Sequence, residues 1–276
     1  MFSMRLFIVL FSTVLLVSSC SRFSKVLKSN DYEYKLRVAD KYYADKDYNH
    51  AQQLFEELFR VFKGSEHFED IYYKFAYCAY YLKDYPNAEN LFKGFVEVFP
   101  NSNKAEEMDY MRAYTFYAQS PKVELDQTNT TKAIGFMQAF VNTHPGSDKV
   151  QEANQIIEKC RAKLELKDYQ AAQLYFDLGY YKAAGVALNS LMNSYPDSEK
   201  SEAYKLLIIK SDYRYAELSI EPKQQERFDA VITQCNEFMD RFPDSKLKPT
   251  VQDYVTATEN QIKILKNNYE QVKKAS

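Results

Sequence analysis

The side chains that most often carry out chemistry in proteins, thiols and imidazoles, are few in this sequence and far apart. They are the histidines His50, His67 and His144 and the cysteines Cys20, Cys78, Cys160 and Cys235. Their spacing fits no zinc, redox or nucleophile motif, and the sequence lacks a Walker loop, a GxGxxG turn, an HExxH pair and a calcium loop. The three later cysteines lie in apolar helical patterns, which favours buried structural thiols. We therefore expect no enzyme activity, no metal site and no cofactor.

Cys20 is the one residue placed for covalent modification. The chain begins with a short basic stretch, residues 1–5, and continues with an apolar run over residues 6–17 that is too short to span a bilayer. Ser18 and Ser19 then lead directly to Cys20. This junction resembles a bacterial lipobox, whose cysteine is acylated and becomes the first mature residue. The alternative is an ordinary secretory signal followed by a chance cysteine.

From this junction we expect a lipoprotein signal peptide over residues 1–19 and a lipidated tether over residues 20–30, with the lipid on Cys20. The tether segment is polar. Two or more acyl chains hold a protein firmly at a membrane, whereas one chain holds it weakly. The folded part would then stay at a membrane surface.

The elements that position the remaining side chains are marked by a recurring phrase: a ring-bearing residue, proline, a turn residue and serine. Four complete copies begin at Phe99, His144, Tyr195 and Phe242, and a degenerate copy begins at Phe62. Each phrase follows an amphipathic run. Proline ends a helix, and the polar residues after it supply turn and cap chemistry for the next helix. The phrases therefore predict the ends of helical repeats.

Between the phrases lies the pattern of the tetratricopeptide repeat (TPR), in which two helices pack closely through small residues. The fourth unit fits best, with Ala172 and Ala184 at small positions, Leu188 and Leu191 at bulky positions, and Pro196 at its end. We expect an all-α, TPR-like α-solenoid of about five helix-turn-helix units with a C-terminal capping helix.

The repeats divide the expected solenoid into two parts. Units 1–3 fall within residues 31–147, and units 4 and 5 with the capping helix fall within residues 148–276. Two turns carry insertions, over residues 121–130 and 219–226, for which the sequence indicates no role.

The composition agrees with a helical protein. Six glycines and eight prolines in 276 residues are too few for a sandwich or barrel, which needs turn residues every few positions. Lys and Arg number 36 against 38 Asp and Glu, so the formal net charge is −2. This balance lacks the basic character of a nucleic-acid-binding protein, and we expect no nucleic acid among the partners.

The 24 tyrosines are the most unusual part of the composition. In a TPR solenoid the inner groove is lined mainly by three positions on one face of each first helix. Two successive units place tyrosine at all three positions, and the first unit contributes Tyr43. The candidate peptide-binding residues are Tyr43, Tyr73, Tyr77, Tyr80, Tyr110, Tyr114 and Tyr117. Two interpretations stay open: the rings bind a peptide along the groove, or they pack between helices.

The combination of lipobox, short tether and five TPR-like units resembles the BamD family, the lipoprotein subunit of the outer-membrane β-barrel assembly machinery. The segments Phe75–Ser102 and Tyr175–Ser198 look especially similar. The resemblance implies a scaffold anchored by lipid to the outer membrane and facing the periplasm. It also implies two partners: a barrel-forming, BamA-like subunit bound by the C-terminal repeats, and nascent outer-membrane proteins received by the N-terminal repeats.

Two other functions remain open at this stage. The chain could be a different periplasmic TPR adaptor lipoprotein of the cell envelope. It could also be a surface lipoprotein that captures glycans by stacking sugars on tyrosine. The glycan function ranks lower because the sequence contains no tryptophan.

Overall fold

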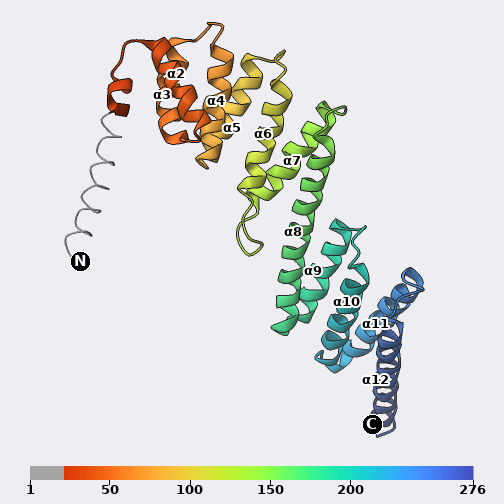
Figure 1. Cartoon of the computed structure of the whole chain (residues 1–276). Helices are drawn as coiled ribbons and strands as arrows, with labels where there is room; N and C mark the ends of the chain where they lie inside the picture. Colours follow the sequence, from red (N-terminus) through yellow and green to blue (C-terminus); the bar gives the residue numbers. More distant parts are fainter. Residues whose placement is uncertain (1–21, 276) are drawn as a thin grey trace, which may run out of the picture. The chain divides into compact units, whose positions relative to one another are not determined.

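The computed structural model describes residues 22–275, and all regular structure among them is helical (Figure 1). Cys20 and the expected signal peptide lie outside the described residues. The chain forms two compact units that divide after Cys160. The helices after the short N-terminal one are α2 (Tyr32–Ala44), α3 (Tyr48–Val61), α4 (Phe68–Tyr81), α5 (Tyr85–Val98), α6 (Ala105–Ala118), α7 (Thr128–Thr143), α8 (Val150–Asp177), α9 (Tyr181–Ser194), α10 (Ser201–Glu217), α11 (Glu221–Arg241) and α12 (Lys248–Ala275).

In the first unit, α2 to α7 form consecutive helical pairs, and each helix packs against the next (Figure 1). Ala39 and Ala51 are fully buried where α2 and α3 cross, because small side chains allow two helices to approach closely. Bulky residues fill the space between pairs, among them Phe55, Phe92 and Phe140. The expected all-α, TPR-like fold is confirmed.

The turn inside a repeat has one recurring geometry. Lys46, Lys83 and Gly179 occupy the same place after the first helix, and each has a positive φ. In the first of these turns the amide of Asp47 donates to the carbonyl of Tyr42 and the amide of Lys46 donates to Tyr43. This pair of hydrogen bonds is a Schellman cap, whose left-handed residue is usually glycine. Only Gly179 satisfies that preference. Lys46 and Lys83 adopt the same backbone conformation although it is unfavourable for a residue with a side chain.

The phrase between repeats joins two helices through its serine. The Ser102 Oγ donates to Glu69 Oε1 at 2.7 Å and accepts from the Lys104 amide at 3.0 Å. The later phrases repeat this double contact: Ser147 donates to Glu106, Ser198 to Glu165 and Ser245 to Glu202, and each serine accepts from the backbone amide two residues later. Each serine therefore caps the start of one repeat and holds the first helix of the repeat before it.

We expect Ser102→Ala to lower the free energy of unfolding by about 1–2 kcal/mol, because it removes a cap and leaves Glu69 without its hydroxyl partner. Ser65→Ala is the matched control. Ser65 holds the same place in the degenerate phrase, and its side chain forms no hydrogen bond within residues 22–275. Urea unfolding of the purified mature chain measures both; equal small effects would contradict the role given to the phrase serine.

The first described residues pack on the first repeat. Residues 22–27 are helical, and the Val26 side chain is buried in the core cluster of α2 and α3. The Phe23 ring lies 4.2 Å from the His50 ring and 5.8 Å from the Tyr42 ring, measured between centroids. Part of the segment expected as a tether, residues 20–30, is therefore docked on the repeat in this structure.

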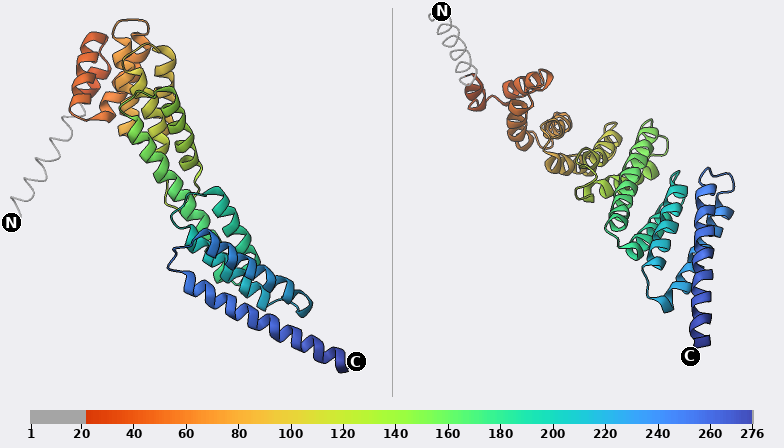
Figure 2. Two further views of the ribbon diagram at one scale, coloured as in Figure 1. Left: turned by 90° about the vertical axis from the view of Figure 1, so that its right-hand side faces the viewer. Right: turned by 90° about the horizontal axis from the view of Figure 1, so that it is seen from below.

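The second unit contains the later part of α8 and α9 to α12. α8 is a single helix, and Ala172 on it packs with Leu188 of α9 and Tyr204 of α10. The expected insertion over residues 219–226 is mostly helical, because residues 221–226 belong to α11. α12 packs on α11 and α10, and its last turns extend past them (Figures 1 and 2). On that extension Ile264 and Tyr269 are exposed.

A half-buried carboxyl lies inside the second unit. Asp212 of α10 packs so closely on Gly185 of α9 that its Oδ1 lies 2.9 Å from the place where a Cβ would stand. Burial raises the pKa of Asp212 to about 6, and Lys205 only partly opposes this. A folded-state pKa above the unfolded value means that ionisation of the carboxyl destabilises the fold as pH rises.

We expect Asp212→Asn to stabilise the chain by about 2 kcal/mol at pH 8, allowing for partial exposure, and to have little effect below about pH 4. Stability of the unchanged chain falls as pH rises from about 4 to about 6 and is level above that, and the asparagine variant lacks that fall. Asp229→Asn, at an exposed carboxyl on α11, is the control. The measurement is the free energy of unfolding across this pH range; a gain from Asp212→Asn that is independent of pH would contradict the account.

Candidate functional site

A run of tyrosine rings extends through the first unit from α2 to α6. The ring centroids of Tyr80 on α4 and Tyr114 on α6 lie 6.3 Å apart, which joins the two predicted triples. Tyr43 of α2 contacts Tyr48, and the Tyr48 ring stacks on Tyr81 of α4 with 4.4 Å between ring centroids. We call this set the tyrosine tract: Tyr43, Tyr48, Tyr73, Tyr77, Tyr80, Tyr81, Tyr110, Tyr114 and Tyr117. All seven candidate tyrosines belong to it.

Members of the tract differ in exposure. Tyr77 and Tyr110 are 7% and 4% exposed, and their rings pack on Phe92 and Phe140 of the core. The other five candidates are half-buried: Tyr43, Tyr73, Tyr80, Tyr114 and Tyr117. Buried rings thus support half-exposed rings beside them. Tyr77 and Tyr110 therefore pack in the core rather than line an open groove, and binding by the half-buried members stays a prediction.

Two phenol groups of the tract, both on α4, meet a carboxylate. Tyr73 donates to Glu107 Oε1 at 3.1 Å, and Tyr77 donates to the same oxygen. Lys104 Nζ lies 4.7 Å from the centroid of the Tyr73 ring, a cation–π contact. These contacts fix the orientation of the rings of α4 against the first turns of α6.

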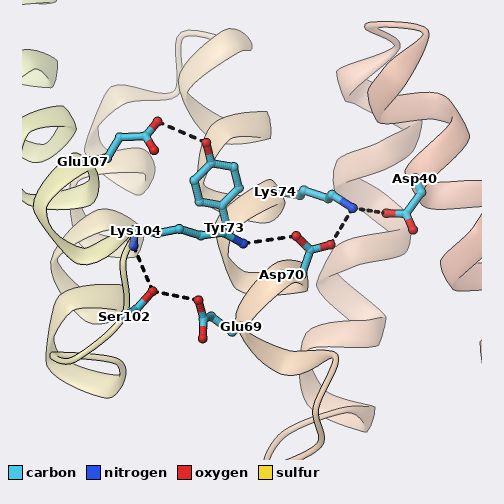
Figure 3. A network of polar contacts seen from close by, with 8 residues as sticks. All are labelled: Asp40, Glu69, Asp70, Tyr73, Lys74, Ser102, Lys104 and Glu107. Carbon is cyan, nitrogen blue, oxygen red and sulfur yellow. Dashed lines mark hydrogen bonds and ion pairs between the residues drawn. The ribbon is translucent and has the colours of Figure 1, made fainter.

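An ionic network beside Tyr73 joins three successive repeats (Figure 3). Lys74 Nζ lies 2.7 Å from Asp40 on α2 and 2.6 Å from Asp70 on its own helix. Lys104 Nζ lies 3.3 Å from the other oxygen of Asp70. The pairs Lys74–Asp40, Lys104–Asp70 and Tyr73–Glu107 each span 34 residues, which is the length of one TPR. The first helices of the three repeats are therefore held in register.

The pKa values of the phenols along the tract are raised. Burial raises the pKa of Tyr73 to about 12, and the neighbouring Glu107 adds to the shift. Burial and, to a smaller extent, Tyr114 raise the pKa of Tyr80 to about 12. Partial burial of Asp70 works in the opposite direction, but Lys74 and Lys104 hold the pKa of that carboxyl below its usual value. The phenols therefore stay neutral at physiological pH and offer apolar faces with hydrogen-bonding tips.

Sequence reasoning missed three members of this site. Tyr48 and Tyr81 lie outside the expected groove positions, because they belong to the ends of helices beside the turn rather than to the inner face. Glu107 does not stand out in the sequence, because it is one of many surface carboxylates. Its spacing of 34 residues from Tyr73 is the one signal in the sequence that could have identified it.

The described residues contain neither a metal-binding cluster nor a membrane-spanning helix. Within residues 22–275 no three His, Cys, Asp or Glu side chains come together as a group that could hold a metal ion. No helix in the same part of the chain is long and apolar enough to cross a membrane. The cysteines Cys78, Cys160 and Cys235 are buried.

A protein-family model shows which family this chain belongs to. The model of the YfiO family, described as outer membrane lipoprotein, matches residues 32–227, from α2 into α11. This chain belongs to that family. YfiO is the BamD family, so the resemblance read from the sequence is confirmed. The chain is a BamD-like outer membrane lipoprotein with a TPR fold, and the tyrosine tract lies wholly within the matched residues.

Among solved structures the chain is similar to a thermophilic TPR protein of Thermus thermophilus. The identity is 15%, the match covers 82% of this chain and 99% of the other, and the TM-score is 0.33. It is also similar to the TPR2AB domain of yeast Sti1 in its pHSP90 complex, with 13% identity, 87% and 95% coverage and a TM-score of 0.40. At these scores neither likeness implies anything about binding. No curated protein matches the chain significantly.

Proposed function

We propose that this BamD-family chain is the lipid-anchored scaffold of the β-barrel assembly machinery at the periplasmic side of the outer membrane. Its first unit receives nascent outer-membrane proteins on the tyrosine tract, and its second unit docks on the barrel-forming, BamA-like subunit. The observation that carries the proposal is the continuous tract of half-exposed tyrosine rings within a chain of this family. The family points to a scaffold or adaptor role rather than to catalysis.

The chemistry of the tract suits such a substrate. Strands of outer-membrane barrels alternate apolar and polar residues and carry aromatic girdles. Tyrosine offers a flat apolar face at low conformational cost and a polar tip that can bond to backbone groups. Because buried members such as Tyr77 support the half-exposed rings, the surface is organised before a peptide arrives. These features support binding of an extended, aromatic-rich segment.

The anchor proposed at Cys20 complements this arrangement. Residues 22–27 already pack on the first repeat through Phe23 and Val26. Two residues of chain then separate Cys20 from Phe23, and a fully extended chain spans about 3.5 Å per residue. Lipid on Cys20, after removal of a signal peptide over residues 1–19, would hold the first unit close to the membrane where nascent barrel proteins arrive.

Affinity purification from detergent-solubilised outer membranes tests the proposal. The full chain with a C-terminal tag should recover a large β-barrel protein with soluble periplasmic repeats. Cys20→Ala should release the chain from the membrane fraction, whereas Cys235→Ala, which alters a buried thiol, should not. Recovery of other envelope proteins without a β-barrel subunit would instead indicate a different periplasmic adaptor and would overturn the assembly role.

A further inference from the structure

An apolar groove lies on the second unit, at the turn that joins α8 to α9. Its volume is about 680 Å³, and its main lining residues are Tyr175, Tyr180, Tyr181, Val186 and Tyr215. They come from the end of α8, from α9 and from α10. The tyrosine tract belongs to the other unit, so this groove is a separate surface with its own residues.

The lining of this groove is open to solvent. Tyr180 is 62% exposed and Val186 is 64% exposed, and the exposed side chains of Leu174, near the end of α8, and Leu178, just after it, are close to the groove in sequence. Large apolar side chains scattered singly over a surface are ordinary, but a contiguous set in a groove marks a place where another molecule binds. Folding alone gives no reason for these residues to be apolar.

Charges around the groove indicate what kind of molecule fits. Lys182 lines the groove, and Arg227 stands 4.1 Å from the Tyr215 ring centroid. Neither cation forms an ion pair with a carboxylate within the described part of the chain. Arg214, near the Tyr181 ring, is instead paired with Glu217 at 2.6 Å. No carboxylate is among the lining residues, so Lys182 gives the groove a positive edge.

The turn at the groove has a left-handed glycine, and two side chains beside it are held by contacts within the unit. Gly179 lines the groove with a φ of +80°, in the left-handed region that favours glycine, and a side chain there would have nothing within 4 Å. The Tyr181 ring packs edge-on against Phe176 at 5.3 Å, and Arg227 donates to Ser219. Tyr181 and Arg227 therefore keep their places without a ligand, which lowers the entropy cost of binding one.

We infer that this groove binds a protein segment in which an aliphatic or aromatic anchor residue is flanked by aspartate or glutamate. The anchor fills the apolar floor between Tyr180 and Val186, and the carboxylates pair with Lys182 of the lining and with Arg227 beside Tyr215. A sugar fits less well, because apart from the phenols Ser190 is the only hydroxyl among the lining residues. Only the name of the partner, the barrel-forming subunit, rests on the proposed function; the class of ligand follows from the groove.

Selection from a phage-displayed library of random 12-residue peptides, against the full chain in detergent, tests the inference. Selected peptides should combine an apolar anchor with Asp or Glu. Val186→Glu should weaken their binding at least tenfold, because it places a carboxylate in the apolar floor. Val98→Glu is the matched control, since Val98 of α5 is 51% exposed on the other unit and should leave binding unchanged. Lys182→Glu should also weaken binding, and added salt should reduce that difference.

The inference is overturned if no peptide is enriched, if selected peptides are basic or uncharged, or if Val186→Glu and Val98→Glu bind them equally. Binding of oligosaccharides on a glycan array that Val186→Glu abolishes, in the absence of peptide binding, would also overturn it. Failure of the proposed function is a separate result: peptides would still bind in the groove, but tagged chain would recover no β-barrel subunit from membranes.

Discussion

Tyr114→Ala is expected to weaken binding of a barrel-protein segment at least tenfold while leaving the helical content of the first unit unchanged. Tyr114 is half-buried, and its ring meets Tyr80, Tyr110 and Tyr117 at centroid distances of 6.3, 5.9 and 5.6 Å. It is therefore the point at which the rings of α4 and α6 meet. Removal of a central aromatic residue commonly costs about 2 kcal/mol or more of binding free energy.

The control for Tyr114→Ala is Tyr34→Ala. Tyr34 of α2 is 41% exposed and lies outside the tract, so its removal deletes the same chemical groups without touching the proposed surface. Binding is measured by isothermal titration with a synthetic peptide of the last strand of an outer-membrane barrel protein from the same genome. Equal losses from the two substitutions would mean that the tract has no special role.

Glu57→Ala is expected to lower the free energy of unfolding of the first unit by about 3 kcal/mol. Lys35 of α2 is only 1% exposed, and its Nζ lies 2.6 Å from Glu57 Oε2 on α3, with the Tyr32 ring 5.3 Å away. Removal of the carboxylate leaves an ammonium group buried without its ionic partner, which is costly. The loss should exceed that of most surface substitutions.

Replacing the lysine of the pair should lower the free energy of unfolding much less than replacing the glutamate. Lys35→Met removes the buried charge and keeps a long apolar side chain in its place, while Glu57 is partly exposed and can be hydrated. The double variant Lys35→Met/Glu57→Ala should therefore be more stable than Glu57→Ala alone. Urea unfolding of the four proteins gives the coupling energy; a double variant that is the least stable of the set would contradict this explanation.

The repeat framework could be predicted from the sequence because its signals are local. Pro100 and Ser102 mark a helix end and a cap, and Ala39 and Ala51 mark a close helix crossing. These effects depend on neighbours within a few residues or on a fixed helical period. The structure adds what that pattern omits: the same serine also binds Glu69 of the preceding repeat.

The sites were only partly predictable, for a physical reason. The periodicity identified which tyrosines share a helix face, but exposure depends on the neighbouring helix. Tyr77 and Tyr114 occupy equivalent positions, yet Tyr77 is buried under Phe92 and bonded to Glu107, and Tyr114 is half-buried. The groove of Tyr180 and Val186 was not predicted, because it depends on how α8, α9 and α10 meet in space.

The central claim is that the tyrosine tract of the first unit contacts nascent barrel proteins. The most direct test places a photocrosslinking amino acid at Tyr80, Tyr114 or Tyr34 of the full-length chain and adds the labelled last-strand peptide. The account predicts crosslinks at Tyr80 and Tyr114 that excess unlabelled peptide removes, and none above background at Tyr34. Crosslinks at Tyr34 alone, or equally at all three positions, would contradict it.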